Sequence, residues 1–293
     1  MSNKIILVTG ASGGIGKETA LALARLGHHV IVHGRDAEKT QAAQGEIRKA
    51  TGSASLDMLT ADLSLMSEVK HFSDELKARY DVIDVLINNA GAQFGTKREV
   101  TAEGHEKTMA INLFAPFLLT HLMLDPLRAS TAGRVVTVSS ESYKMGGKPD
   151  LSDIELRDNY SMGRAYGFSK LYVIWIMRRF AEEARALGAS NVTFNSLEPG
   201  SAATDLGRVS TQSPMTRLMY FLWKPMMWSL QKAAATSVYL ATSEEVASVT
   251  GGFFGNCQEK AVRPALLSPE GEQVVWNYCA EVCADYLKDY PAA

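Results

Sequence analysis

Cysteine is scarce in this chain, with three residues among 293, all of them late in the sequence. Their odd number and sparse placement argue against a disulfide framework and favour a reducing compartment. Cys279 and Cys283 lie four positions apart on an expected helix, a spacing that could suit a metal pair. No further ligand lies nearby, so two small buried side chains are favoured, and we expect no metal site.

Long apolar runs and clustered charge are also missing. No run approaches the roughly 18 residues of a membrane-spanning helix, and the N-terminus lacks the basic and apolar pattern of a secretory signal. The net charge is only -2, and the basic residues form no stripe. Neither nucleic acid nor an anionic membrane is therefore favoured as a partner. We expect a cytoplasmic protein without a transmembrane segment.

The chain does contain enough apolar sequence for a large core, with 46% hydrophobic and 21% charged residues. Short Val/Ile/Leu-rich runs alternate with amphipathic segments, which indicates buried strands separated by helices. The expected strands are 5–8, 30–33, 56–59, 85–87, 135–138, 192–197 and 253–256, with helices at 17–26, 68–79, 233–241 and 270–286 among others. This alternation predicts a doubly wound parallel sheet of Rossmann type, in three α/β/α layers and a single domain over 1–293.

Glycines gather where the first strand ends and the first helix begins. Glycine lets the backbone approach a pyrophosphate, while the helix start offers free N–H groups and a positive dipole. Any tight turn can be rich in glycine, but the place of this one between strand and helix favours a dinucleotide site. The residues expected to line it are Thr9, Gly10, Ser12, Gly14, Ile15 and Gly16.

The end of the second strand indicates which dinucleotide binds. An acidic side chain there serves the ribose hydroxyls of NAD, whereas an arginine accommodates the 2′-phosphate of NADP. Asp36 could serve NAD, yet it equally suits the N-cap of the next helix. Arg35 offers a planar, permanently charged fork for a phosphate, or else is a solvated surface residue. We favour NADP(H).

Five motifs in this order resemble those of the short-chain dehydrogenase/reductase family. They are residues 9–16, Asn88-Asn89-Ala90-Gly91, Asn112, Ser140 and Tyr166-x-x-x-Lys170, and the resemblance extends over about residues 4–256. It implies a Rossmann-type sheet, NAD(P), and an active site made of Asn112, Ser140, Tyr166 and Lys170. By position, Gly34 stands where NAD-using members usually carry Asp, and Arg35 where NADP-using members carry a basic residue.

Tyr166 and Lys170 can be argued from their own chemistry. Four residues apart on an expected helix, they share one face. A free phenol has a pKa near 10, and a nearby ammonium together with the positive nicotinamide ring favours the phenolate. Tyr166 can then act as the acid in ketone reduction and the base in alcohol oxidation. A buried tyrosine near a surface lysine is the structural alternative, and Lys170 would also hold the ribose hydroxyls.

Ser140 and Asn112 complete the expected active site. Ser140 ends the fifth strand, where its hydroxyl can donate to a substrate oxygen. Strand alternation places Ser139 on the opposite face, and the resemblance selects Ser140. Pro116 has no N–H to donate to the main-chain carbonyl of Asn112. The resemblance implies that this carbonyl binds a water molecule that connects Lys170 to solvent. A kink needed only for packing is the alternative.

The resemblance implies further cofactor contacts after the third, fourth and sixth strands. Asp62 and Leu63 would lie against the adenine, and the backbone of residues 89–91 would pass the adenine ribose. Thr204 would bond the carboxamide. The residues concerned are Asp62, Leu63, Asn89, Ala90, Gly91, Pro199, Gly200 and Thr204.

The 25 residues between Ser140 and Tyr166 exceed the number in many family members. They make the chain similar to the retinol-dehydrogenase-like branch, which includes relatives of the WW-domain oxidoreductase, and imply NADP(H) and lipophilic alcohols or carbonyls. Glu198 departs from that branch, in which a histidine often precedes Pro-Gly. Residues 201–231 are rich in Met and aromatic side chains and are expected to form an apolar substrate lid. For the stretch 218–230 within them, a subunit interface or shallow membrane contact is an alternative.

These observations predict an NADP(H)-dependent oxidoreductase that acts on the carbonyl or alcohol of an apolar small molecule and forms a homo-oligomer, a dimer or a tetramer. Reduction of a conjugated C=C bond, as in the protochlorophyllide reductases, is a second enzymatic possibility. A protein that senses NADP(H) without turnover is a third. The presence of all four expected catalytic residues argues against the sensor.

Overall fold

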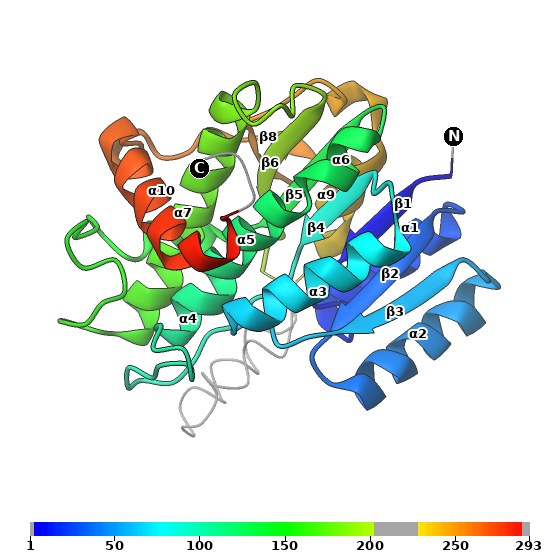
Figure 1. Ribbon diagram of the computed structural model, residues 1–293, viewed down its shortest axis with the longest axis horizontal. Helices are drawn as coiled ribbons and strands as arrows, with labels where there is room; N and C mark the ends of the chain where they lie inside the picture. The colour runs from blue at the N-terminus through cyan, green and yellow to red at the C-terminus, as the bar shows by residue number, and fades with distance from the viewer. Residues whose placement is uncertain (1–2, 202–227, 289–293) are drawn as a thin grey trace.

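A computed structural model describes residues 3–201 and 228–288. In these ranges the strands form one sheet in the order β3-β2-β1-β4-β5-β6-β7-β8 (Figure 1). Neighbours from β3 to β7 are parallel, and β8 pairs antiparallel to β7. The strands are β1 (Ile5–Val8), β2 (His29–Gly34), β3 (Leu56–Thr60), β4 (Val85–Asn88), β5 (Gly133–Val138), β6 (Val192–Glu198), β7 (Phe253–Gly255) and β8 (Gln258–Glu259). The predicted doubly wound fold is confirmed, and β8 is an addition that the sequence did not indicate.

Helices cover both faces of this sheet (Figure 1). They are α1 (Gly14–Arg25), α2 (Ala37–Thr51), α3 (Met66–Arg79), α4 (Lys107–Met109), α5 (Ala115–Leu122), α6 (Leu124–Ala129), α7 (Met162–Glu183), α9 (Leu230–Thr242) and α10 (Pro269–Cys283). A π-helical turn (Ala110–Phe114) joins α4 to α5, and four 3-10 turns lie at Glu141–Lys144, Glu244–Val246, Pro264–Leu266 and Ala284–Tyr286. The expected helix 270–286 is therefore α10 followed by a 3-10 turn.

Alternate residues of β1 separate the two halves of the core. Leu7 packs into the cluster that contains side chains of α3, α5, α7 and α10. Ile6 and Val8 pack into the cluster on the other face, with side chains of α1, α2 and α9. Because both faces are covered, β1 is apolar at every position rather than at every second one.

The starts of α1 and α2 differ in a way that bears on function. The Asp36 side chain caps α2 by accepting a hydrogen bond from Lys39 N at 3.0 Å, so its expected capping role is confirmed. Helix α1 begins at Gly14, earlier than the expected start at residue 17, and no side chain caps it. Its first N–H groups are thus left for another partner.

Two kinds of feature are absent from the described parts of the chain. Residues 3–201 and 228–288 contain no group of three or more His, Cys, Asp or Glu side chains arranged for a metal ion. The same residues form no helix that combines the length and the apolar character needed to cross a membrane. Cys279 and Cys283 are buried in α10, and burial raises the pKa of both thiols.

Candidate active site

The expected site residues meet along one edge of the sheet. The parallel strands pair with their carboxyl ends side by side, as at Val8 with Ile87 and Val138 with Leu197. The segments that follow β1, β3, β4, β5 and β6 all carry predicted site residues. Open α/β sheets bind ligands at this edge.

The glycine-rich loop after β1 fits the pyrophosphate of a dinucleotide. A Cβ on Gly16 would lie 2.4 Å from both Gly10 O and Asn89 Nδ2, so the loop folds this tightly only without a side chain there. At Gly13, the N-cap of α1, a Cβ would meet nothing within 4 Å. The first turn of α1 has no acidic residue, so open space and free N–H donors lie together at the positive end of the helix dipole.

Thr9 and Asn89, both expected to contact the cofactor, use their side chains to join two loops. Thr9 Oγ1 donates to Ile87 O at 3.2 Å and accepts from Asn89 N and Ala90 N, each at 3.0 Å. Asn89 Nδ2 donates to Thr9 O at 2.8 Å and to Gly10 O at 3.2 Å. These bonds hold the loop after β4 against the glycine-rich loop, so both residues fix backbone positions.

His33 is a supporting residue that the sequence analysis missed. Its Nδ1 accepts from Gly10 N at 3.2 Å, which leaves the ring proton on Nε2, 3.2 Å from Ala61 O. Burial lowers its pKa to about 4, so the ring stays neutral at physiological pH. The available signal was a polar side chain inside an otherwise apolar strand.

The end of β2 carries the residues that are expected to select between NAD and NADP. A Cβ on Gly34 would lie 2.2 Å from Thr40 Oγ1 and 2.9 Å from Ser12 Cβ, so a larger residue requires a shift there. The Arg35 side chain is 73% exposed, with Nη1 3.7 Å from Asp62 Oδ2. An exposed pair of this kind contributes little free energy, which leaves the guanidinium available to an anion.

Asp62 and Leu63 follow β3 at the same edge. The Leu63 side chain belongs to the core, so only its backbone is left to face the site. Asp62 Oδ1 accepts hydrogen bonds from Ser64 N at 3.0 Å and Ser64 Oγ at 2.7 Å. The carboxylate therefore shapes its own turn as well as facing Arg35.

Asn112 lies in the π-helical turn between α4 and α5. Its Nδ2 donates to Ala92 O and Ser169 Oγ, and its Oδ1 accepts from Ala92 N, each at 2.9 Å. Turns of this kind often occur at functional sites, and Pro116, at the start of α5, has no N–H for the Asn112 carbonyl. Asn112 thus ties the loop after β4 to α7.

Ser139 and Ser140 face opposite ways, as strand alternation predicts. Ser139 is buried and its Oγ donates to Lys170 O at 2.6 Å. Ser140 Oγ accepts from Ser142 N at 3.1 Å, and the Ser140 hydroxyl lies close enough to the Tyr166 phenol to act on its pKa, which it lowers. Of the two serines, only Ser140 is therefore placed to act together with Tyr166.

Tyr166 and Lys170 lie on one face of α7, with Lys170 Nζ 5.7 Å from the centre of the Tyr166 ring. Lys170 is only 4% exposed and donates to Val138 O at 2.9 Å. Burial lowers its pKa to about 8. Burial also raises the pKa of Tyr166, and the Ser140 hydrogen bond only partly opposes this. The expected lowering of the phenol pKa is thus not found in the protein alone, where Lys170 donates to a carbonyl.

Gly91 brings the backbone between Lys170 and Asn112. A Cβ at this position would lie 3.0 Å from Asn112 Oδ1 and 3.3 Å from Lys170 Nζ. The loop after β4 therefore passes directly against both side chains. A ligand that reaches Lys170 would also touch this backbone.

Comparison with known sequences identifies the family. A family model described as short chain dehydrogenase matches residues 4–214, more than half of the chain. The chain belongs to the short-chain dehydrogenase/reductase family. Human retinol dehydrogenase 14 is 35% identical over 305 aligned positions, which cover 98% of this chain and 88% of that protein. Human retinol dehydrogenase 13 is 36% identical, with 95% and 84% covered. The predicted place in the retinol-dehydrogenase-like branch is confirmed.

Solved structures support the same family fold. An uncharacterised protein from Mycobacterium paratuberculosis has a TM-score of 0.76 at 25% identity, with 97% of this chain and 94% of that chain covered. A short-chain dehydrogenase from Shigella flexneri, complexed with NADP, has a TM-score of 0.68 at 25% identity, with 88% and 98% covered. A homologous structure from Escherichia coli, complexed with NADPH, has the same score and identity, with 87% and 97% covered.

This member of the family ends β6 with Glu198 in place of the frequent histidine. Glu198 is 5% exposed, and its Oε2 accepts from Gly200 N at 2.7 Å. Gly200 has a φ of +75°, and a Cβ there would lie 2.5 Å from the Trp228 ring. Pro199 and Gly200 thus form a tight turn at the site edge. Thr204, and most of the expected lid over residues 201–231, lie outside the described residues.

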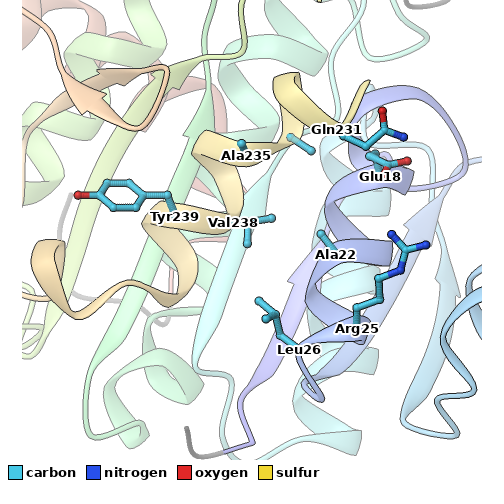
Figure 2. A pocket seen from close by; sticks show the side chains of 9 residues that line it. Glu18, Ala22, Arg25, Leu26, Gln231, Ala235, Val238 and Tyr239 are labelled. Atoms are coloured by element: carbon cyan, nitrogen blue, oxygen red, sulfur yellow. The ribbon is translucent and has the colours of Figure 1, made fainter. Parts of the chain in front are cut away.

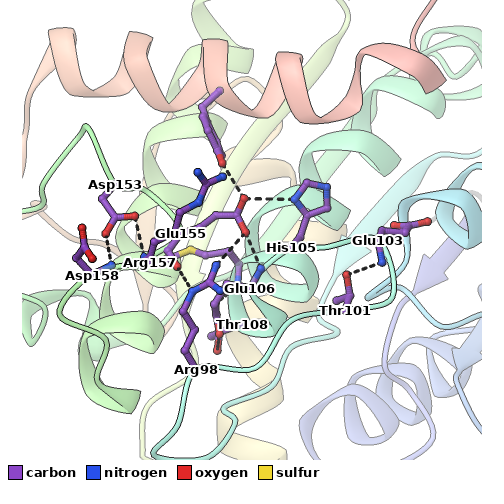
Figure 3. Close-up of polar contacts among 12 residues, drawn as sticks. Arg98, Thr101, Glu103, His105, Glu106, Thr108, Asp153, Glu155, Arg157 and Asp158 are labelled. Carbon is purple, nitrogen blue, oxygen red and sulfur yellow. Dashed lines mark hydrogen bonds and ion pairs between the residues drawn. The ribbon is translucent and has the colours of Figure 1, made fainter.

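The segment 141–161, which is long for the family, is anchored by a buried carboxylate (Figure 3). Glu155 accepts from Glu106 N at 2.5 Å, Tyr278 Oη at 2.7 Å and His105 Nδ1 at 3.3 Å. Burial acts to raise the pKa of Glu155, but these hydrogen bonds outweigh it and the pKa is lowered. The segment is thereby fixed to the loop before α4 and to α10. No local pattern in the sequence indicates these partners, because they are far apart along the chain.

An apolar groove of about 490 Å³ lies between α1 and α9, away from these residues (Figure 2). It is lined by Glu18, Ala22, Arg25, Leu26, Gln231, Ala234, Ala235, Val238 and Tyr239. None of the expected catalytic or cofactor-binding residues lines it. The groove is therefore separate from the candidate active site of this short-chain dehydrogenase/reductase.

Proposed function

We propose that this protein is an NADP(H)-dependent oxidoreductase that acts on a carbonyl or alcohol carbon of an apolar small molecule. The observation that carries the proposal is the placement of the Tyr166 phenol beside the Ser140 hydroxyl, with the centre of the Tyr166 ring 5.7 Å from Nζ of the buried Lys170. It lies at the same sheet edge as a glycine-rich loop that fits a pyrophosphate. A bound nicotinamide supplies or accepts the hydride, and the chain handles the proton.

Tyr166 is the group that exchanges this proton in our proposal. In reduction its phenol donates to the oxygen on which charge develops, and Ser140 donates a second hydrogen bond to the same oxygen. In oxidation the phenolate accepts the proton of the alcohol. Because burial raises the pKa of Tyr166, ionisation near neutral pH requires positive charge close to the ring. Lys170 shares its helix face and can supply that charge.

Lys170 and Asn112 would organise the cofactor side of the site. The ammonium lies against the loop after β4, where it can reach ribose hydroxyls that pass Gly91. Asn112 holds this loop and α7 together through Ala92 and Ser169. Its side chain is therefore engaged in fixing the site, and its main-chain carbonyl is the group left for a water.

Preference for NADPH over NADH is a testable part of the proposal. A charge-assisted contact between Arg35 and the 2′-phosphate gives an expected NADPH affinity about tenfold higher than that for NADH. Arg35→Ala should erase most of this preference by weakening NADPH binding alone. Titration of both dinucleotides by protein fluorescence measures it, with Arg48→Ala, at the far end of α2, as the matched control. A wild-type protein that favours NADH would contradict the assignment.

The substrate class is inferred from the relatives. Several of the most similar curated proteins are named retinol dehydrogenases, and retinol is an apolar alcohol. The length of the segment that follows Ser140 supports the same inference. We therefore expect apolar, medium-sized ketones, aldehydes or alcohols to be converted in preference to small polar ones.

A substrate panel tests the function. Ketones, aldehydes, alcohols and enones of increasing chain length are incubated with NADPH or NADP, and the products are identified by mass spectrometry. Alcohols formed from carbonyls, with the rate rising with apolar length, are the expected result. Saturated ketones formed from enones would favour C=C reduction. Tight NADPH binding without turnover of any member of the panel would favour the sensor.

A cytoplasmic location and a homo-oligomeric state, dimer or tetramer, belong to the same proposal. The three cysteines form no disulfide, which suits a reducing compartment. Cell fractionation tests the location, and size-exclusion chromatography with light scattering tests the assembly.

A further inference from the structure

Lys260, which follows β8, lies at the centre of an ion cluster next to the candidate active site. Its ammonium donates to Glu198 Oε1 at 2.9 Å and to Glu141 Oε1 at 2.5 Å. Glu198 ends β6, and Glu141 begins the turn after β5, so a single side chain bridges the ends of two neighbouring strands. Lys260 N donates to Phe253 O at 2.7 Å, which fixes this residue against β7.

Both carboxylates are directly connected to residues of the candidate site. Glu141 follows Ser140 in the sequence. The two carboxylate oxygens of Glu198 have different partners. Oε1 accepts from Lys260 Nζ, and Oε2 accepts from Gly200 N at 2.7 Å. Movement of Lys260 would therefore be transmitted to the serine on one side and to the Pro199–Gly200 turn on the other.

The surrounding backbone leaves room for this ion cluster. A Cβ on Gly255 would lie 2.3 Å from Glu198 Oε1 and 2.7 Å from Lys260 Cδ, so the pair fits only because residue 255 is glycine. Lys144 pairs with the second oxygen of Glu141, which gives two acids, two lysines and no net charge. A neutral cluster can fix geometry, but it adds little long-range field to the site.

The cluster persists at neutral pH because its central cation is held in the charged form. Burial acts to lower the pKa of Lys260, but hydrogen bonds to Glu141 and Glu198 outweigh this effect and raise it. Glu198, by contrast, is almost fully buried. Removal of the lysine alone would leave that carboxylate without its charged partner.

We propose that Lys260 is a positioning residue that sets the separation between Ser140 and the Pro199–Gly200 turn. The proposal rests on the proposed function, in which Ser140 contacts the substrate oxygen, and on the cofactor contact expected at Pro199 and Gly200, next to the residue expected to bond the carboxamide. Reaction rates depend steeply on such a separation, and a misplacement of about 1 Å can cost about 10²-fold. The competing explanation is an ion cluster that only stabilises the fold.

Ligand binding separates these explanations without any turnover. Lys260→Met should raise the Kd for NADPH about tenfold, because the turn at the nicotinamide end loses its support. The same variant should bind 2′,5′-ADP, which carries the adenosine phosphates but no nicotinamide, as the wild type does. Isothermal titration calorimetry measures both ligands. Equal weakening of both, or unchanged NADPH binding, would overturn the positioning role.

A double variant keeps the test valid if Lys260→Met folds poorly. Glu198→Gln combined with Lys260→Met removes the unpaired charge but retains an oxygen that can accept from Gly200 N. We expect its melting temperature to recover towards the wild-type value while NADPH binding stays weak, because the bridge to Glu141 is still missing. Recovery of both properties would show that the cluster acts through stability alone.

Kinetics on a substrate found with the panel provide a second readout. Lys260→Met should lower kcat about 10²-fold. Because hydride transfer then becomes rate-limiting, the kinetic isotope effect measured with NADPH deuterated at the transferred hydrogen should increase. Lys260→Arg, which keeps the charge, should restore most of the rate. The control is Lys70→Met, which removes an exposed ion pair with Asp74 and should change neither kcat nor the isotope effect. If Lys260→Met lowers kcat without a larger isotope effect, the proposal is contradicted. If the wild type shows no turnover, the proposed function fails, while calorimetry still reports on Lys260.

Discussion

Tyr166→Phe is expected to lower turnover about 10²–10⁴-fold, the usual cost of losing general acid–base catalysis. The substitution removes the hydroxyl that lies beside Ser140 and keeps the ring, so packing within α7 is retained. NADPH binding should remain within about twofold of the wild type, because a single neutral hydrogen bond is at stake. Steady-state rates and cofactor titrations, made on the same preparation, measure the two effects.

Tyr172→Phe is the matched control for this experiment. It removes a hydroxyl from a buried ring on the same helix, at a position outside the proposed machinery, and should leave the rate near the wild-type value. A Tyr166→Phe protein that turns over an identified substrate at full rate would refute the mechanism. It would also favour the alternative of a sensor.

Lys170→Met should reduce turnover by a comparable factor and also weaken NADPH binding. The ammonium is charged below its pKa of about 8, and a charged neighbour favours the phenolate of Tyr166. Burial alone would then hold the pKa of the phenol above its ordinary value. Combined with Tyr166→Phe, the loss should be no greater than that of either single variant, because both act on one protonation event.

The Lys170→Met variant should also change the pH dependence of alcohol oxidation. Oxidation requires the phenolate, so its rate should rise with pH through an apparent pKa that belongs to the coupled pair. In the wild type this value should lie below about 10, the pKa of a free phenol, and in Lys170→Met it should move upward. Lys148→Met, an exposed lysine, serves as the matched control. A profile that does not move would exclude Lys170 as the source of the shift.

Local patterns in the sequence were enough to predict most of the framework. Apolar runs located the parallel strands, and the glycines after β1 located the uncapped start of α1. The helix cap at Asp36 and the opposite orientations of Ser139 and Ser140 also follow from local rules, namely side-chain capping and strand alternation. Each of these features depends on neighbours within a few residues.

Features that depend on distant partners could not be predicted in this way. No local rule indicates that Lys170 donates to Val138 O, 32 positions away, or that Lys260 bridges Glu141 and Glu198. The π-helical turn around Asn112 is similar, since its widened backbone is fixed by contacts with the loop after β4 and with α7. The raised pKa of Tyr166 in the protein without its cofactor could not be predicted for the same reason, because burial is a property of the assembled fold.

Glu155 has a consequence for the order in which the protein folds. Its partner Tyr278 lies 123 positions further along the chain, and Glu106 lies 49 positions before it. Closing so long a loop costs conformational entropy before any contact compensates for it. The sheet can form from nearer pairings, but the segment after Ser140 that contains Glu155 acquires its hydrogen bond from Tyr278 only when α10 docks. A ribosome-bound chain that ends before residue 278 therefore has all four proposed catalytic residues in its sequence but lacks this anchor of the segment that follows Ser140.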